Sequence, residues 1–328
     1  MTTFRLAAES DDAILRAMLR ENGMPTWVEM TIEREPSFFA GKNLFGRDWA
    51  VIAEDKSDVI GMYTASVMPV HLNGKPTTLG YLGGLRVNPQ HRRRIRHLRE
   101  GYATIGRFAP EPVPWWFTAV AAENESARRL LERGVPGLPP YHPQGDYVTF
   151  ALPVSRGKRH GLWKRASGED VVSMYNKAAA NFQYSPVLDE ETAKRLDFYV
   201  CGDAVAALWD QRAFKQIVAR RYRHPKLVPL YNAYARAMRR IPLPREGGAL
   251  QQTFIAFLAM PPDYTLLQDL LSHCETPAAS LGVHRNHELI PVIERFKPVG
   301  YPARIYAVTF NGAPPASTFP AQPEAALL

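Results

Sequence analysis

One stretch decides the fold: LRVNPQHRRRIRHL, residues 85–98. The apolar run that leads into it, residues 78–87, predicts a strand, which Pro89 ends. Further on, apolar residues recur at helical spacing and predict a helix: Ile95, Leu98, Tyr102 and Ile105. A strand therefore leads through a basic turn into a helix, whose first turn has unpaired backbone N–H groups and a partial positive charge. Such a turn binds phosphate, and Arg92, Arg93 and Arg94 add guanidinium groups suited to a pyrophosphate.

The basic turn has two other interpretations, a solvated helix face or a nucleic-acid contact. The chain has a formal net charge of +8 and a sequence pI near 9.5, which favours anionic partners in general. Its basic residues gather in separate clusters, at residues 92–99, 220–223 and 236–240, and do not form one continuous stripe. We therefore expect no stable nucleic-acid partner, and the position of the turn directly after a strand favours the phosphates of a small ligand.

The rest of the N-terminal half has a regular order of elements. A strand at residues 3–6 precedes a helix whose apolar positions include Leu15 and Leu19. Residues 26–48 show no clean period and predict short helices or a long loop over a site. The elements that follow are a hairpin at residues 49–54 and 59–72, a turn at Asn73-Gly74, a strand at 115–121, a helix that ends at Gly134 and a strand at 147–152.

Two motifs within this order resemble the GNAT acyltransferase superfamily. One is the strand-to-helix stretch at residues 85–94, and the other is AENESARRLLERG, residues 122–134, which is similar to the family's N-x-x-A segment and following helix. The resemblance covers residues 3–152. It implies a splayed pair of strands that holds the pantetheine arm of acetyl-CoA or another acyl-CoA, with the pyrophosphate on the amides of residues 91–96. The donor-binding residues that it implies are Leu85, Arg86, Val87, Arg92, Arg93, Arg94, Ile95, Arg96, His97, Asn124 and Ala127.

The sequence departs from the family's pattern at three places. In the usual R-x-x-G-x-G/A loop, Ile95 and His97 replace small residues that let the backbone approach phosphate closely. Leu131 replaces a tyrosine that in many members protonates the leaving thiolate, and Gly83 and Gly84 stand where a carboxylate is common. An acid and a base must then come from elsewhere. The candidates are Tyr81, His71, Glu123, Tyr141 and His142, each of which could instead be a surface or packing residue.

The C-terminal half partly repeats the pattern after a polar linker at residues 155–160. It predicts strands at residues 162–165, 198–201, 204–209, 214–221, 254–259, 278–283 and 303–310, and helices at 167–180, 264–274 and 287–296. This order resembles a second, degenerate GNAT domain, in which Pro261 and Pro262 replace the phosphate turn and remove its backbone donors. We expect this half to bind no CoA and to shape the acceptor cleft.

The sequence thus predicts an α/β fold of two tandem GNAT-like domains, each a mixed, largely antiparallel sheet flanked by helices. The predicted domains are residues 1–154 and 161–312, and the Pro- and Ala-rich tail, residues 313–328, is predicted to be disordered. An inserted segment, residues 224–245, has Leu230, Tyr231, Tyr234 and Met238 at near-helical spacing. It could be an amphipathic lid, a membrane-surface element or an ordinary packed helix.

Composition narrows the class of protein. No apolar run approaches the roughly 20 residues of a membrane span, and acidic residues follow the first few residues, so we expect a cytoplasmic protein. Cys201 and Cys274 lack the spacing of a metal or redox site, and no metal site is predicted. The expected function is CoA-dependent N-acyltransfer, with acetyl as the expected group, to a small-molecule or peptide amine. The alternative is a catalytically impaired CoA-binding or regulatory module, and the sequence does not predict the acceptor or the oligomeric state.

Overall fold

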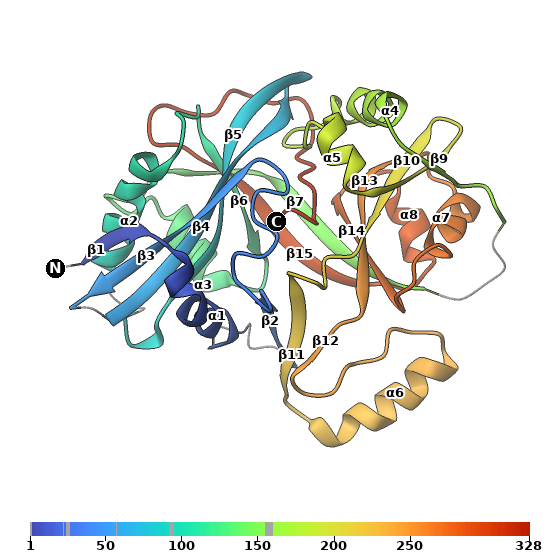
Figure 1. Ribbon diagram of the computed structural model, residues 1–328, viewed down its shortest axis with the longest axis horizontal. Helices are drawn as coiled ribbons and strands as arrows, with labels where there is room; N and C mark the ends of the chain where they lie inside the picture. The colour runs from blue at the N-terminus through green and yellow to red at the C-terminus, as the bar shows by residue number, and fades with distance from the viewer. Residues whose placement is uncertain (1, 22, 24–26, 57, 92–94, 155–159) are drawn as a thin grey trace.

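A computed structural model of the chain describes residues 2–21, 23, 27–56, 58–91, 95–154 and 160–328. A twelve-stranded sheet runs through the whole molecule in the order β1-β3-β4-β5-β6-β15-β7-β14-β13-β10-β9-β8 (Figure 1). Its strands are β1 Thr3–Leu6, β3 Arg47–Asp55, β4 Asp58–Leu72, β5 Lys75–Val87, β6 Trp116–Ala121, β7 Tyr141–Pro153, β8 Lys164–Ala166, β9 Asp197–Cys201, β10 Ala204–Trp209, β13 Gln252–Ala259, β14 Ala278–His284 and β15 Val299–Val308. Among the described strands of this sheet, only β5–β6 and β13–β14 pair in parallel, so the predicted mixed, largely antiparallel sheet is confirmed.

Helices cover both faces of this sheet (Figure 1). They are α1 Asp12–Glu21, α2 Ile95–Phe108, α3 Glu125–Glu132, α4 Glu169–Ala179, α5 Glu190–Lys194, α6 Val228–Ala237, α7 Tyr264–Leu271 and α8 Ile290–Glu294, with 3-10 turns at Glu9–Asp11, Pro89–His91 and Pro225–Leu227. Because successive strand residues point to opposite faces, Ile52 of β3 packs with α1 while Val51 packs with α2. None of these helices is long and apolar enough, over the described residues, to cross a membrane.

The two halves of the chain exchange their last strands. Strand β15, near the C-terminus, lies between β6 and β7, and β7 from the N-terminal half pairs with β14 along its length. One hydrophobic cluster accordingly joins both halves, with Val70 and Phe117 from the first and Ala207 and Phe254 from the second. The division into domains at residues 154–161 stays a prediction, and each predicted domain would lend one strand to the other.

A second, three-stranded sheet has the order β12-β11-β2 and corrects one prediction. Its strands are β2 Val28–Glu33, β11 Gln216–Tyr222 and β12 Gly248–Ala249. Residues 26–48 were expected to form short helices or a loop, yet β2 lies within them and pairs with β11, almost two hundred positions away. The run VEMTIE alternates apolar and polar residues, which is a strand signal that the mixed composition of residues 26–48 obscured. Its polar residues Thr31 and Glu33 are the buried ones, because they face the rest of the protein once β2 pairs with β11.

The prediction of a disordered tail at residues 313–328 is wrong. The described tail returns to the centre of the molecule, where Ala321, Ala325 and Ala326 are buried in the cluster that joins the two halves. Figure 1 shows the chain ending beside β6, β7 and β15. Its Pro and Ala content resembles that of disordered segments, but small side chains also fit a narrow space between packed strands.

Candidate active site

The site begins where β5 and β6 separate. They form only two parallel pairs, Gly80 with Trp116 and Tyr81 with Phe117, although β5 continues to Val87 and β6 to Ala121. A Cβ atom on Gly80 would lie 2.1 Å from the Trp116 ring, so glycine allows the strands to meet there. Beyond these pairs the Thr118 hydroxyl donates to the Leu82 carbonyl oxygen at 2.7 Å. The strands then diverge and leave a gap between their carboxyl ends.

A bulge in β5 lies at this gap. Gly83 pairs with Thr64 of β4 and Arg86 pairs with Met62, so that Gly84 and Leu85 together oppose one residue. Gly84 has a φ of 58°, and a Cβ atom there would lie 2.6 Å from the Thr64 hydroxyl oxygen. Leu85, which follows, is 47% exposed. The bulge therefore redirects the backbone of Leu85, Arg86 and Val87 at the place where the sequence predicts a ligand strand.

Helix α2 starts just beyond the end of β5, as the sequence predicts. The predicted residues Arg92, Arg93 and Arg94 lie outside the described residues. Arg96 is largely exposed and forms an ion pair with Glu100 at 2.7 Å, one helical turn on. His97 is mostly buried, and its Nδ1 lies 2.9 Å from the Thr2 hydroxyl. Ile95 is partly buried at the first position of α2. Arg96 thus has an exposed guanidinium group in the first turn of α2. Arg86, at the end of β5, is partly buried and donates to the Leu85 carbonyl oxygen at 3.0 Å.

Helix α3 begins at the same edge, after β6. Asn124 caps it, since its Oδ1 accepts from the Ala127 N–H at 3.3 Å and from the Ser126 hydroxyl at 3.3 Å. The N-x-x-A motif is thus a helix cap that leaves the side-chain NH₂ of Asn124 available, and Glu123 beside it is exposed. Because β5 and β6 are parallel, the starts of α2 and α3 flank the open end of the same gap.

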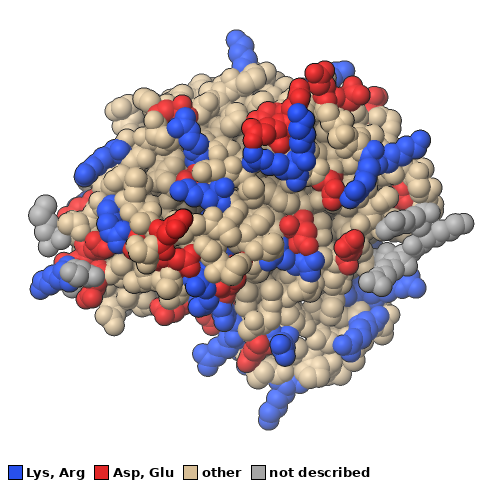
Figure 2. Space-filling model, viewed as in Figure 1, with Lys and Arg blue, Asp and Glu red and all other residues tan. Residues whose placement is uncertain are grey.

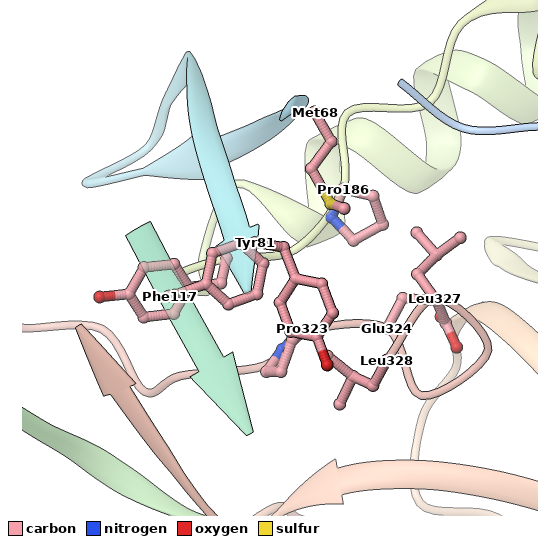
Figure 3. A pocket seen from close by; sticks show the side chains of 9 residues that line it. Met68, Tyr81, Phe117, Pro186, Pro323, Glu324, Leu327 and Leu328 are labelled. Atoms are coloured by element: carbon pink, nitrogen blue, oxygen red, sulfur yellow. The ribbon is translucent and has the colours of Figure 1, made fainter. Parts of the chain in front are cut away.

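A small pocket adjoins the closed end of the gap. Tyr81 and Phe117, the last paired residues of β5 and β6, both line it, and their rings lie 5.1 Å apart. Tyr184, from the loop between α4 and α5, stacks on Phe117 at 5.0 Å. Figure 3 shows the tail closing the other side of this pocket. The remaining lining residues are Met68, Pro186, Pro323, Glu324, Leu327 and Leu328.

Glu324 has the one acidic side chain among the residues described as lining the pocket. Its oxygens accept from the backbone N–H of Phe257 at 2.8 Å and of Ala326 at 3.2 Å. Burial raises the pKa of Glu324 to about 7, although these N–H groups and the charge of Lys215 oppose the rise. A carboxyl group that titrates there can accept a proton near neutral pH.

Two further groups define the polarity of the pocket. Burial raises the pKa of Tyr81 above its usual value, so its hydroxyl stays protonated and can donate. The Lys215 ammonium group donates to the backbone oxygen atoms of Leu328 at 2.7 Å and Ala326 at 3.3 Å. Burial, followed by the charge of Arg34, lowers the pKa of Lys215 to about 8. The tail residues that close the pocket are therefore fixed by a buried cation.

The structure separates the predicted proton-transfer candidates. Tyr81 lines the pocket, whereas His71 is buried in β4 beside it and pairs through its backbone with Tyr184 and Ser185. Burial lowers the pKa of His71 and keeps its imidazole neutral, and its Nδ1 has no hydrogen-bond partner among the described residues. Glu123 lies at the open end of the gap, not at the pocket.

The two remaining candidates are engaged elsewhere in the sheet. The hydroxyl group of Tyr141 bonds that of Tyr102 at 2.5 Å, and His142 Nε2 lies 3.1 Å from the Thr309 hydroxyl oxygen. Neither Tyr141 nor His142 lines the pocket. The sequence missed Glu324 because it stands in the segment expected to be disordered, where the apolar run Ala325 to Leu328 was the available signal.

A second gap lies between β13 and β14, and the tail occupies it. These strands pair only at residues 252–254 and 278–280, and β13 has its own irregularity at Phe257, whose φ is 50°. The Gln322 side chain bonds the Gly282 carbonyl oxygen and the His284 N–H, while Glu324 bonds Phe257 on the other strand. The Tyr147 hydroxyl donates to the Pro323 carbonyl oxygen at 2.7 Å. The chain's own backbone thus lies in the second gap.

Comparisons with known proteins agree with this arrangement. Residues 30–100 match the family model described as an acetyltransferase (GNAT) domain. The N-myristoyltransferase of Saccharomyces cerevisiae, solved with bound myristoyl-CoA, is 11% identical with a TM-score of 0.56, and the alignment covers 95% of this chain and 84% of that one. A putative acetyltransferase from Pyrococcus horikoshii is also 11% identical, with a TM-score of 0.51 and coverage of 94% and 90%.

A third structure, a GCN5-related N-acetyltransferase from Kribbella flavida, is 13% identical with a TM-score of 0.42; the alignment covers 79% of this chain, which spans 59% of that longer protein. A search of curated protein sequences found no significant match. The N-myristoyltransferase and Pyrococcus structures show the fold. The family model covers β3, β4, β5 and the start of α2, which form one side of the gap. Residues 30–100 therefore match a GNAT acetyltransferase domain, and the chain shares its fold with the N-myristoyltransferase and Pyrococcus structures.

Proposed function

We propose that the protein is an acyl-CoA-dependent N-acyltransferase that moves an acetyl or longer acyl group from CoA to an amine. The observation that carries this proposal is the gap between β5 and β6, which has two helix starts at its open end and a mostly apolar pocket at its closed end. A pantetheine arm is long and narrow, and a pyrophosphate binds at a helix N-terminus. The gap therefore suits both parts of one CoA molecule.

In this proposal the donor binds as an added strand along β5. The backbone of Leu85, Arg86 and Val87 would pair with the amide groups of pantetheine, as an extended ligand pairs with an open strand edge. The pyrophosphate would lie against the first turn of α2, and the predicted contacts of Arg92, Arg93, Arg94, Ile95, Arg96 and His97 belong to it. Across the gap, the free NH₂ of Asn124, with Ala127 behind it, would face the pantetheine chain.

The chemistry would take place at the pocket. The amine nitrogen attacks the thioester carbon, the C–S bond breaks, and the products are an amide and CoA thiol. Glu324 would accept the proton that the amine loses, and Tyr81 would donate a proton to the leaving thiolate. The pocket is lined mainly by apolar and aromatic side chains but is small, so it would take the reacting amine while the rest of the acceptor lies outside it. We expect the second half to bind no CoA, because the tail occupies its gap.

The test is thermal unfolding with CoA, acetyl-CoA and myristoyl-CoA, followed by a thiol-release assay with a panel of amines. A ligand at 100 times its Kd stabilises the folded state by about 2.7 kcal/mol, which is readily measured. The proposal predicts stabilisation by at least one acyl-CoA and thiol release that Tyr81→Phe and Glu324→Gln reduce. Stabilisation without release from any amine would favour the CoA-binding module instead, and no stabilisation by any of the three would refute the donor site.

A further inference from the structure

An arm, residues 220–247, projects from the body of the molecule between β11 and β12. Figure 1 shows α6 at its outer edge, away from the twelve-stranded sheet. The arm is held in one conformation by its own contacts. The side chain of Asn232 bonds the backbone of Leu243 at both ends, the Tyr231 hydroxyl donates to the Ile241 carbonyl oxygen, and Ala235 is fully buried. One face of α6 is therefore fixed against the returning segment.

The opposite side of the arm carries a stripe of exposed apolar residues. Leu230 is 70% exposed, and its neighbours along the helix are about half exposed. The stripe consists of Leu227, Leu230, Tyr234 and Met238. Their spacing of three and four residues places them on one line along the helix, facing away from the protein. Exposed apolar residues grouped in this way, unlike scattered ones, indicate a contact surface.

The charge of the arm is almost entirely positive, and its one carboxylate, Glu246 at its end, accepts from the Tyr222 N–H at 3.0 Å. Between Arg220 and Arg245 the sequence has no Asp or Glu, and it has these basic residues: Arg220, Arg221, Arg223, Lys226, Arg236, Arg239, Arg240 and Arg245. Arg220 pairs with Glu33 of β2. Within the described part of the chain, no ion pair with a carboxylate is formed by Arg223, Lys226 or Arg236, all of which are exposed. Figure 2 shows Lys and Arg side chains around an otherwise uncharged surface at the lower right, where α6 lies.

We propose that the arm binds the surface of an anionic lipid bilayer, with the apolar stripe at the boundary between headgroups and acyl chains. An interfacial helix combines an apolar face with flanking basic residues, and α6 with its neighbours has both. The basic residues would contact lipid phosphates, while Tyr234 suits the headgroup level. A nucleic acid would match the charge but would leave the aliphatic side chains of the stripe in water. This inference is independent of the proposed acyltransferase activity.

The contact would position the whole molecule. Arg240 donates to the carbonyl oxygen of Lys297, just before β15, which ties the arm to the C-terminal half. Val299 and Tyr301 at the start of β15 are also exposed, at 44% and 49%. A docked arm would therefore hold the sheet at a fixed orientation to the lipid surface.

The test is cosedimentation of the full chain with phosphatidylcholine vesicles, with and without phosphatidylglycerol. We expect binding to the anionic vesicles and a steep decrease with added salt. Removing one arginine near the lipid surface should weaken partitioning to the vesicles by about fivefold. The double variant Arg236→Gln, Arg239→Gln should therefore partition about 25-fold more weakly. The pair Leu230→Ser and Tyr234→Ser should cost at least about tenfold, and the exposure of both side chains leaves the core intact.

Matched controls are Leu6→Ser in β1 and Arg133→Gln after α3, both of which are exposed and distant from α6 in Figure 1. They should bind vesicles like the parent protein. The proposal is overturned if anionic vesicles are not bound, or if the arm variants bind as well as the controls. It is equally overturned if Leu230→Ser, Tyr234→Ser abolishes a dimer in solution while no vesicles are bound, or if the arm retains DNA but not vesicles.

Discussion

Replacement of Glu324 by Gln should change both stability and activity in a manner set by pH. The pKa of Glu324 is raised from 4.5 to about 7 by burial, so the folded state holds its proton more tightly than the unfolded state. The contribution of this group to stability is then full below about pH 4.5 and is lost as the pH rises through about 7. The difference amounts to about 3 kcal/mol when the group is fully ionised. Gln keeps the shape of the protonated acid and cannot ionise.

The assay is urea unfolding of both proteins at about pH 5 and about pH 9. The free energy of unfolding of Glu324→Gln, compared with that of the parent protein at the same pH, should be about 1–3 kcal/mol more favourable at the higher pH than at the lower pH. In the acyl-transfer assay, kcat/KM of the parent protein should rise with pH through about 7, because the base must be ionised. Glu324→Gln should lower kcat/KM by about 10²–10⁴-fold and should no longer show this rise with pH. Glu123→Gln, at an exposed carboxylate, is the control and should follow the parent in both assays. An equal stability difference at both pH values would refute the titration of Glu324.

Three further predictions concern the scaffold of the site. Gly84→Ala should lower the free energy of unfolding by about 1–2 kcal/mol, because the φ of 58° is left-handed and the new Cβ would meet Thr64. The same variant should weaken acyl-CoA binding. The control Gly106→Ala in α2, which has open space around it, should be neutral or stabilising in urea unfolding. Asp269 is fully buried and accepts hydrogen bonds from the backbone N–H groups of residues 160–163. Burial alone would raise the pKa of Asp269, but these N–H groups lower it overall. Asp269→Asn should therefore lower the free energy of unfolding by about 2–4 kcal/mol at neutral pH, and by less as acid protonates the carboxylate of the parent protein. Lys215→Met should release the tail, seen as faster amide hydrogen exchange at residues 324–328, and unchanged exchange there would contradict its anchoring role.

The elements that the sequence predicts well are those with local signals. The strand before Pro89 and the helix from Ile95 follow from an apolar run and from helical spacing, and the structure has both within a few residues. The turn predicted at Asn73 and Gly74 is also present, and both residues have the positive φ that a tight hairpin turn requires. The N-x-x-A motif needed only a helix cap, and Asn124 provides one.

The features that the sequence does not predict depend on residues far away along the chain. The strand β2 has a local alternating pattern, but its pairing with β11 in a separate sheet has no local signal. The exchange of β7 and β15 likewise places each strand beside strands of the other half. Glu324 was missed for the same reason, since its pKa and its contact with the pocket arise only when the tail enters the second gap. Local composition indicated a disordered tail, and burial against both halves outweighed it.

The central claim is that CoA binds between β5 and β6 and not between β13 and β14. Amide hydrogen exchange with and without CoA, read at residues 83–88 and 95–98 and compared with residues 255–260, tests it most directly. With CoA bound, exchange should be slower in the first two segments and unchanged in the third, because the tail already occupies the gap between β13 and β14. Protection of residues 255–260 alone, or no protection at residues 83–88 when CoA is bound, would contradict it.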